Sequence, residues 1–191
     1  MNIFVLDNNP IKAAAAMDCV RVPKMVTESA QMMASALRRY DATDEQMPLT
    51  KAGRPYLGGY KNHPCTIWAG DSRANFKWLA QHARALLFEY YVRFSKTSEI
   101  MSNKTHACYG PIYAMSGMTD MIPEGKLTPF AIAIADHMEC RKLPDFDNMS
   151  AVEKYRAYYI HDKQHFAKWN KGRPAPTWWS PAPTFGVDVR E

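Results

Sequence analysis

The residues best suited to do chemistry gather in one stretch, residues 18–33, which reads DCVRVPKMVTESAQMM. If this stretch is a helix at about 100° per residue, four polar side chains fall within a quarter-turn of one another, namely Arg21, Lys24, Glu28 and Gln31. The other faces carry Met, Val and Ala. Charge along the edge of an apolar helix is costly unless it is paired or faces a cleft. The pattern therefore predicts either a series of ion pairs that orients the helix or a functional stripe.

Glu28 is the candidate acid of this stripe. It follows Lys24 by four residues and stands near Met25 and Met32, which suggests partial burial. A partly buried carboxylate beside cations can stabilise the positive charge that develops on a sugar when a glycosidic bond breaks. The functional hypothesis therefore makes Glu28, with Arg21 and Lys24, part of a catalytic site.

A second cluster, Asn62-His63-Pro64, follows a segment rich in Gly and Pro. A helix that begins at Pro64 leaves its first N–H groups free to bind an anion such as phosphate. Lys61 adds positive charge, and His63 could donate or shuttle a proton. The alternative is a capped turn with a structural histidine. The functional hypothesis adds His63 to the catalytic site and predicts that Lys61 and Asn62 contact DNA.

The C-terminal part of the chain interleaves basic and aromatic side chains. The basic ones are Lys154, Arg156, Lys163, Lys168, Lys171 and Arg173, and the aromatic ones are Tyr155, Tyr158, Tyr159, Trp169, Trp178 and Trp179. Cations beside flat rings suit phosphate contacts combined with base stacking, although core rings with a rim of solvated cations give the same pattern. We predict DNA contacts for Arg156, Lys168, Arg173, Trp178 and Trp179. Prolines precede the two tryptophans and stop a helix, so we expect both rings to contact DNA or close the site rather than join the core.

Metal and cofactor chemistry have weaker support. His161 and His165 have the i,i+4 spacing of two ligands to one zinc ion, and His137 and Cys140 could complete the set, but no local spacing fixes a third ligand. Two solvated histidines on a helix are commoner, so we predict no metal and no cofactor. The chain has no glycine-rich phosphate loop, G-x-S-x-G or H-E-x-x-H motif, so nothing supports an NTPase, a serine hydrolase or a zinc peptidase.

Length and composition limit the class of protein. The chain has 191 residues with 47% hydrophobic content, which fits one domain with a core. Its net charge of +5 has the sign expected for a polyanion ligand. Four separated cysteines without a C-x-x-C pair argue against a zinc ribbon and a disulfide scaffold. No secretory signal or apolar run of about 20 residues is visible, so we expect a cytoplasmic protein of a bacterium or phage-infected cell, without a membrane partner.

The pattern along the chain predicts a mainly α, compact single-domain helical bundle with at most a short N-terminal strand. Helices are expected over residues 11–20, 24–40, 73–94, 128–140 and 150–169, with a short helical turn from 64 and a loop over 41–61. A Ser150–Glu153 capping box begins the last helix. We assign residues 1–170 to a helical DNA-acting domain and 171–191 to a Pro/Trp-rich C-terminal tail, and the pattern leaves the oligomeric state open.

Several motifs together are similar to the pattern of one known family. Asp18, Arg21-Val22-Pro23-Lys24, Glu28 and Gln31 match a D-x-x-R-L-G-K-x-x-x-E-x-x-Q signature in most positions. Asn62-His63-Pro64 with Trp68 resembles an N-H-P-x-x-x-W block, and Glu89 with Arg93 resembles an E-x-x-x-R pair. Tyr155-Arg156-Ala157-Tyr158-Tyr159 and Thr177-Trp178-Trp179 resemble closing motifs of phage members. The chain thus resembles the small bacterial and phage pyrimidine dimer DNA glycosylases of the endonuclease V type, chiefly over residues 1–94.

The resemblance implies a compact helical protein that acts on double-stranded DNA. In phage endonuclease V an N-terminal amine attacks the sugar C1′ and forms an imine that allows strand cleavage, while a glutamate stabilises the sugar cation and arginines hold the phosphates. Here Asn2 is a large residue that leaves Met1 in place, and Arg21 aligns with the family's glutamate, so Glu28 would act from about two turns along.

Three functions follow as hypotheses. The preferred one is a DNA N-glycosylase, with or without an abasic-site lyase step, for damaged or modified pyrimidines. The second is a phage enzyme that modifies 5-substituted pyrimidines in DNA. The third is a non-catalytic DNA-binding protein, which would not depend on Glu28.

Overall fold

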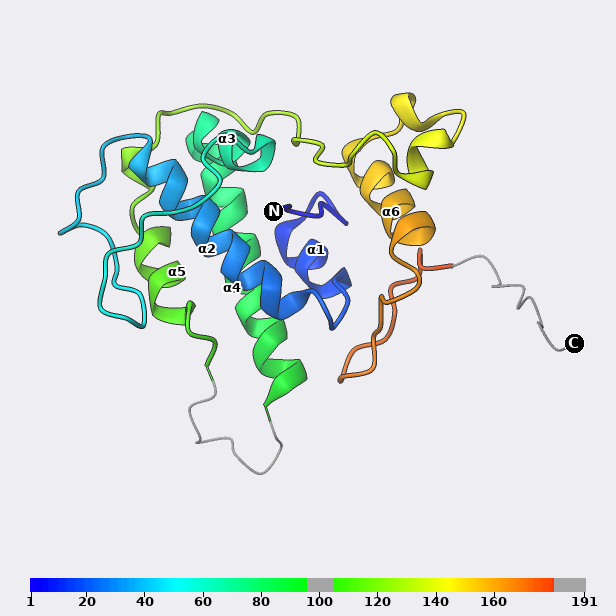
Figure 1. Cartoon of the computed structure of the whole chain (residues 1–191), viewed down its shortest axis with the longest axis horizontal. Helices are drawn as coiled ribbons and strands as arrows, with labels where there is room; N and C mark the ends of the chain where they lie inside the picture. The colour runs from blue at the N-terminus through cyan, green and yellow to red at the C-terminus, as the bar shows by residue number, and fades with distance from the viewer. Residues whose placement is uncertain (96–104, 181–191) are drawn as a thin grey trace, which may run out of the picture.

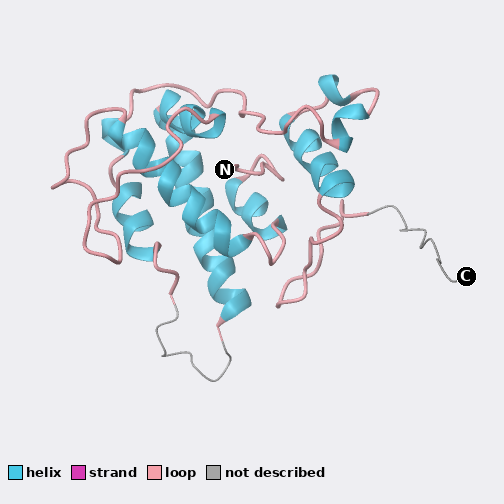
Figure 2. Cartoon of the chain, in the orientation of Figure 1, coloured by secondary structure: helices cyan, strands magenta, loops and turns pink. Residues whose placement is uncertain are grey.

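The computed structural model describes residues 1–95 and 105–180, and over these ranges the chain is helical without a β-strand (Figure 2). The α-helices of this part are α1 (Pro10–Ala16), α2 (Val22–Arg38), α3 (Pro64–Asp71), α4 (Arg73–Phe94), α5 (Tyr109–Ser116) and α6 (Ala151–Asp162). Short 3-10 turns follow at η1 (Thr119–Met121), η2 (Glu139–Lys142) and η3 (Phe146–Asn148). The mainly α prediction is confirmed. None of the described helices is both long and apolar enough to cross a bilayer.

The N-terminal segment lies between two groups of helices (Figure 1). On one side, α2 and α4 pack together, and α1, α3 and α5 pack against them. On the other side lies α6, whose tyrosines 155, 158 and 159 contact the ring of Phe4. Residues 3–6 are buried but do not form the strand that the sequence allowed, because Phe4 adopts a left-handed backbone (φ 50°) and the Leu6 N–H donates to the Phe4 carbonyl (2.8 Å). The start of the chain is therefore fixed inside the molecule.

Helix α2 carries the predicted stripe and begins two residues earlier than expected. Pro23 fits its first turn, where the missing N–H costs no hydrogen bond. Just before it, the Asp18 carboxylate accepts the backbone N–H groups of Val20 (2.9 Å) and Arg21 (3.1 Å). Because this turn needs residues 17–21, α1 ends at Ala16, and the helix predicted to reach residue 20 is shorter.

Helix α4 matches its predicted bounds and holds the end of α1. Its cap is Ser72, whose hydroxyl accepts the Asn75 N–H (3.1 Å). Near its C-terminal end Glu89 and Arg93 form a buried ion pair (2.9 Å). Arg93 also donates to the backbone carbonyls of Ala15 (2.9 Å) and Met17 (2.6 Å), which the end of α1 leaves without helical partners. The E-x-x-x-R motif is thus part of the scaffold that positions Asp18.

The helix predicted over residues 128–140 is wrong. Residues 128–135 have no regular secondary structure and residues 136–138 form a turn before η2, and tertiary hydrogen bonds replace helical ones. The Thr128 N–H donates to the buried Asn75 side chain (2.9 Å), and the Tyr155 hydroxyl accepts the Ala133 N–H (3.0 Å) and donates to the Ala131 carbonyl (2.9 Å). Side chains from α4 and α6 therefore decide the conformation of this segment.

The last helix has the predicted capping box but ends at Asp162, seven residues before the predicted end. The chain then folds back, and its two tryptophans pack against the core. Trp178 meets the Tyr159 ring edge to face (6.1 Å), and Trp179 packs against Trp169 (4.7 Å). Both tail tryptophans are half-buried and pack against the core without joining it, and their contact with DNA stays a prediction. The rest of the predicted tail, residues 181–191, lies outside the described residues.

Candidate functional site

The N-terminal segment, α2 and the end of α6 enclose a pocket of about 240 Å³, which we call the Glu28 pocket. Three of the predicted catalytic residues, Arg21, Lys24 and Glu28, line it. Met1, Asn2, Tyr158 and Lys163 also contribute to its wall. The structure therefore places the predicted stripe against a concave surface, as the functional hypothesis requires.

Glu28 is held by groups from the start of the chain. Its side chain is 12% exposed, and its Oε2 accepts the Asn2 N–H (3.0 Å) and lies 3.9 Å from the Met1 amino group. Lys24 Nζ lies 3.5 Å from Oε1, but its side chain is 72% exposed. An exposed pair of this kind contributes little stability, so Lys24 can leave Glu28 and bind another anion at small cost.

Arg21 is anchored far more firmly than Lys24. Its guanidinium donates to the fully buried Asp18 carboxylate (3.0 Å) and lies over the Phe166 ring (4.0 Å). Asp18 also accepts the Tyr159 hydroxyl (3.0 Å). Burial, with the Asp18 charge, raises the pKa of Tyr159 well above its usual value, so this hydroxyl remains a donor. Arg21 thus joins α2 to α6 and presents one side to the pocket.

His63 lies beside the Glu28 pocket rather than in its lining. It caps α3, and its Nδ1 accepts the Cys65 N–H (3.2 Å), so that N–H is not free for phosphate. Burial and the positive amino group of Met1 lower the pKa of His63, whereas Glu28 raises it. The ring is therefore neutral near pH 7 and within electrostatic reach of both groups.

Lys163 and Tyr158 are pocket residues that the sequence did not single out as catalytic. Lys163 Nζ lies 4.3 Å from the centre of the Tyr158 ring, which stacks on Phe4 at 6.1 Å. Their only sequence signal was the interleaving of cations with rings. It could not show that α6 ends at Asp162 and so turns Lys163 towards the pocket.

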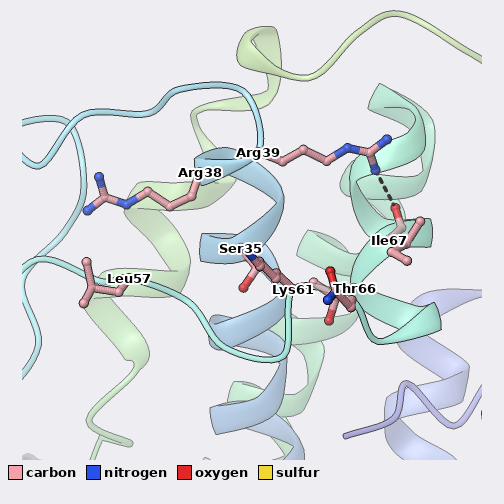
Figure 3. Close-up of a pocket in the computed structure, with 8 residues that line it drawn as sticks. Ser35, Arg38, Arg39, Leu57, Lys61, Thr66 and Ile67 are labelled. Atoms are coloured by element: carbon pink, nitrogen blue, oxygen red, sulfur yellow. Dashed lines mark hydrogen bonds between the residues drawn. The ribbon is translucent and has the colours of Figure 1, made fainter.

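Lys61 and Asn62 line a second pocket, between α2 and α3, with a volume of about 540 Å³. We call it the α2–α3 pocket; Figure 3 shows it with Arg38 and Arg39 extending to opposite sides. Thr66 of its wall donates its hydroxyl to the Met1 sulfur (3.3 Å), and Met1 lines the Glu28 pocket. The two pockets are therefore neighbours.

The other predicted DNA contacts lie in the C-terminal part of the chain, where both arginines have structural partners. Arg156 donates to the Leu6 carbonyl (2.9 Å) and lies over the Trp178 ring (5.4 Å). Arg173 binds both oxygens of Glu89 (2.8 and 3.0 Å). Lys168 is exposed. Contact of these residues with DNA stays a prediction.

The remaining candidate side chains are the histidines with metal-ligand spacing and the four cysteines. His165 lies beyond the end of α6, so it does not share a helix with His161. Over residues 1–95 and 105–180 no three His, Cys, Asp or Glu side chains are grouped to hold a metal ion. The four cysteines are unpaired and buried, and burial raises the pKa of Cys65 to about 11 and of Cys140 to about 12. These two thiols are therefore poor nucleophiles near neutral pH.

Comparison of the chain with protein-family models, with curated proteins and with solved structures gave no match. The function has to be inferred from the pockets themselves.

Proposed function

We propose that this protein is a DNA N-glycosylase that acts on damaged or modified pyrimidines in double-stranded DNA. The observation that carries the proposal is the Glu28 pocket, where a partly buried carboxylate lies 3.9 Å from an amino group and 3.5 Å from a lysine. Charge separation of this kind suits a reaction in which a sugar becomes positive as its base departs. The motif resemblance agrees with this chemistry, and a DNA substrate agrees with the predicted cytoplasmic location.

In the proposed reaction, the C1′–N bond breaks and its electron pair leaves with the base. The Glu28 carboxylate stabilises the positive charge on the sugar, and the departed base takes up a proton from solvent. An attacking group then gives C1′ a new electron pair. If water attacks, it loses a proton to Glu28 and the product is an abasic sugar. If the Met1 amine attacks, in its neutral form after losing one proton to solvent, its nitrogen bonds to C1′ and loses a second proton to Glu28. The C1′–O4′ bond then breaks, O4′ takes up a proton, and the product is an imine, which allows elimination of the 3′ phosphate.

The size of the pocket limits what it takes in. At about 240 Å³ it is smaller than the roughly 300–1,000 Å³ of sites that enclose a whole drug-sized ligand. We therefore expect it to hold one sugar and the edge of one base, which must leave the base stack to reach it. Lys24, and Lys163 on the opposite wall, would contact the flanking phosphates.

The proposal is tested with duplex oligonucleotides that each carry one damaged or modified pyrimidine, with products analysed by mass spectrometry. Release of a free base is the expected result. Sodium borohydride reduces any imine, so an adduct trapped this way and mapped by peptide analysis identifies the attacking amine as Met1, Lys24 or Lys163. A changed base that stays attached to the sugar would favour the base-modification function instead.

The decisive variant is Glu28→Gln, which keeps an acceptor for the Asn2 N–H and removes the charge. We expect a loss of about two to three orders of magnitude in the rate of base release, as for one lost electrostatic stabiliser, with DNA affinity retained. Glu45→Gln, at an exposed carboxylate on the 41–61 loop, is the matched control. If Glu28→Gln instead lowers the melting temperature and leaves the rate unchanged, Glu28 only orients α2.

A further inference from the structure

The polar edge of α2 continues past the Glu28 pocket. Ser35 and Arg38 follow Gln31 on the same side of the helix, because steps of four and three residues return to one face, and the C-cap residue Arg39 extends away from Arg38 (Figure 3). At about 1.5 Å per residue, Arg38 lies about 15 Å along the axis from Glu28. The edge therefore leads from the Glu28 pocket towards the α2–α3 pocket, which Ser35 and Arg38 line.

The α2–α3 pocket has a strongly one-sided charge. Arg38, Arg39 and Lys61 line it, and none of its described lining residues is Asp or Glu. The carboxylates that pair with the arginines, Asp44 and Asp71, approach from outside the lining. Arg39 remains 47% exposed despite its pair with Asp71 (2.9 Å). The pocket thus suits an anionic ligand.

The backbone of the pocket is held in place. The Ser35 hydroxyl accepts the Gly59 N–H (2.8 Å) and donates to the Gly59 carbonyl (3.0 Å). Gly58 adopts φ 84°, and a Cβ there would lie 2.7 Å from the Ser35 nitrogen, so a glycine is needed where the loop crosses α2. Lys61 and Asn62 follow this crossing. Their backbone is therefore fixed before any ligand arrives.

We propose that the α2–α3 pocket binds backbone phosphates of a nucleic acid strand whose reacting nucleotide lies at the Glu28 pocket. This inference rests on the proposed function and adds the path of the strand: along the polar edge of α2, past the Met1–Thr66 contact that joins the two pockets. At about 3.4 Å per nucleotide of B-form DNA, 15 Å corresponds to about four nucleotides. The pocket would position the substrate without touching the reacting atoms.

The test compares two double variants of equal charge. Arg39→Gln with Lys61→Gln removes two cations from the pocket, and Lys51→Gln with Arg54→Gln removes two exposed cations of the 41–61 loop that do not line it. The affinity for undamaged duplex DNA is measured from 50 to 300 mM salt. Each lost phosphate contact should reduce the log–log slope by about 0.9, so the pocket variant should lose about 1.8 and the control nothing. Equal slopes for the two variants would overturn the inference.

A second arm distinguishes the strand from a free nucleotide. Calorimetry with a nucleoside 5′-monophosphate should show no tight binding to the full chain. Binding that the pocket variant abolishes, with an unchanged DNA slope, would assign the pocket to free nucleotides and overturn the inference. Measurement of base release distinguishes failure of this inference from failure of the proposed function. A reduced slope without base release from any substrate would support the phosphate pocket and refute the glycosylase. Base release with an unreduced slope would support the glycosylase and refute the phosphate pocket.

Discussion

Two cations of the same helical edge, Arg21 and Lys24, have opposite roles. Arg21 is 11% exposed and pairs with a carboxylate that has no access to solvent. Removing one partner of a buried pair leaves the other charge uncompensated, so we expect Arg21→Ala to lower the free energy of unfolding by about 3 kcal/mol. Lys24→Ala, at a 72% exposed side chain, should change it by less than about 0.5 kcal/mol. Urea denaturation of the two variants measures the difference.

The same pair of variants separates folding from binding. Lys24→Ala should weaken DNA binding at unchanged stability, because its ammonium group is free to move to a phosphate. Arg21→Lys keeps the charge but loses the flat guanidinium that lies over the Phe166 ring, so it should be intermediate in stability. Equal stabilities for Arg21→Ala and Lys24→Ala would mean that the Asp18 carboxylate does not depend on Arg21.

A buried histidine should make stability depend on pH. His82 is fully buried, its Nδ1 lies 3.0 Å from the Pro10 carbonyl, and its Nε2 has no hydrogen-bond partner in the described chain. Burial lowers the pKa of His82 to about 4. Between the unfolded value of about 6.5 and 4, the unfolded chain binds a proton that the folded chain does not. Stability should therefore fall as pH falls through this window, by at most about 1.4 kcal/mol per pH unit from this group.

Urea midpoints at pH 7 and pH 4.5, for the wild type and His82→Gln, measure this effect. His63 and His106 also have lowered pKa values, mainly because of burial, so the variant should keep part of the dependence. The comparison uses the change between the two pH values, so a lower absolute stability of the variant does not obscure it. If His82→Gln and the wild type lose the same stability between pH 7 and pH 4.5, protonation of His82 does not destabilise the folded protein.

The elements that the sequence predicted well are those specified by local contacts. Helix α4 has helical periodicity over its whole length and a Ser72 cap, and its bounds were predicted to the residue. The grouping of Lys24 with Glu28 is also local, since i,i+4 spacing fixes it. The segment 128–140 was mispredicted because its apolar run resembles a helix locally. Its backbone instead forms hydrogen bonds with the side chains of Asn75 and Tyr155, which come from distant parts of the chain. For the same reason no pattern showed that Asn2 binds Glu28.

The tail is an element whose packing changes the expected result of mutation. Trp178 contacts the buried Tyr159 ring and Trp179 contacts the partly buried Trp169 ring, so replacing both with alanine removes buried apolar surface. For two half-buried rings we expect a loss of about 3 kcal/mol, or roughly 6–12 °C in melting temperature for a domain of this size. Leu57→Ala, at a 74% exposed side chain, is the control for calorimetry. A shift no larger than that of the control would show that the packing of the two rings does not stabilise the fold.

At the scale of the whole molecule, the net charge of +5 does not show which cations can bind a ligand, because some of them are paired within the fold. Several arginines are used inside the fold: Arg93 and Arg173 share Glu89, and Arg156 holds the N-terminal segment through the Leu6 carbonyl. Lys24 and Lys61 are exposed cations that line the two neighbouring pockets. Composition alone could predict an anionic partner but not which face it binds, because pairing depends on carboxylates distant in sequence.

The salt dependence of DNA binding reports how many of these cations take part. If contacts come from Lys24 and Lys163 at the Glu28 pocket and from Arg39 and Lys61 at the α2–α3 pocket, four phosphates give a log–log slope of about −3.6. If Arg156, Lys168 and Arg173 also bind DNA, as their sequence pattern predicts, seven contacts give about −6.3. Titration of a fluorescent duplex between 50 and 300 mM salt separates the two values. We expect the smaller one, because Arg156 and Arg173 would have to leave partners at 2.8–2.9 Å. A slope near zero, or no binding at 50 mM salt, would refute the DNA partner itself.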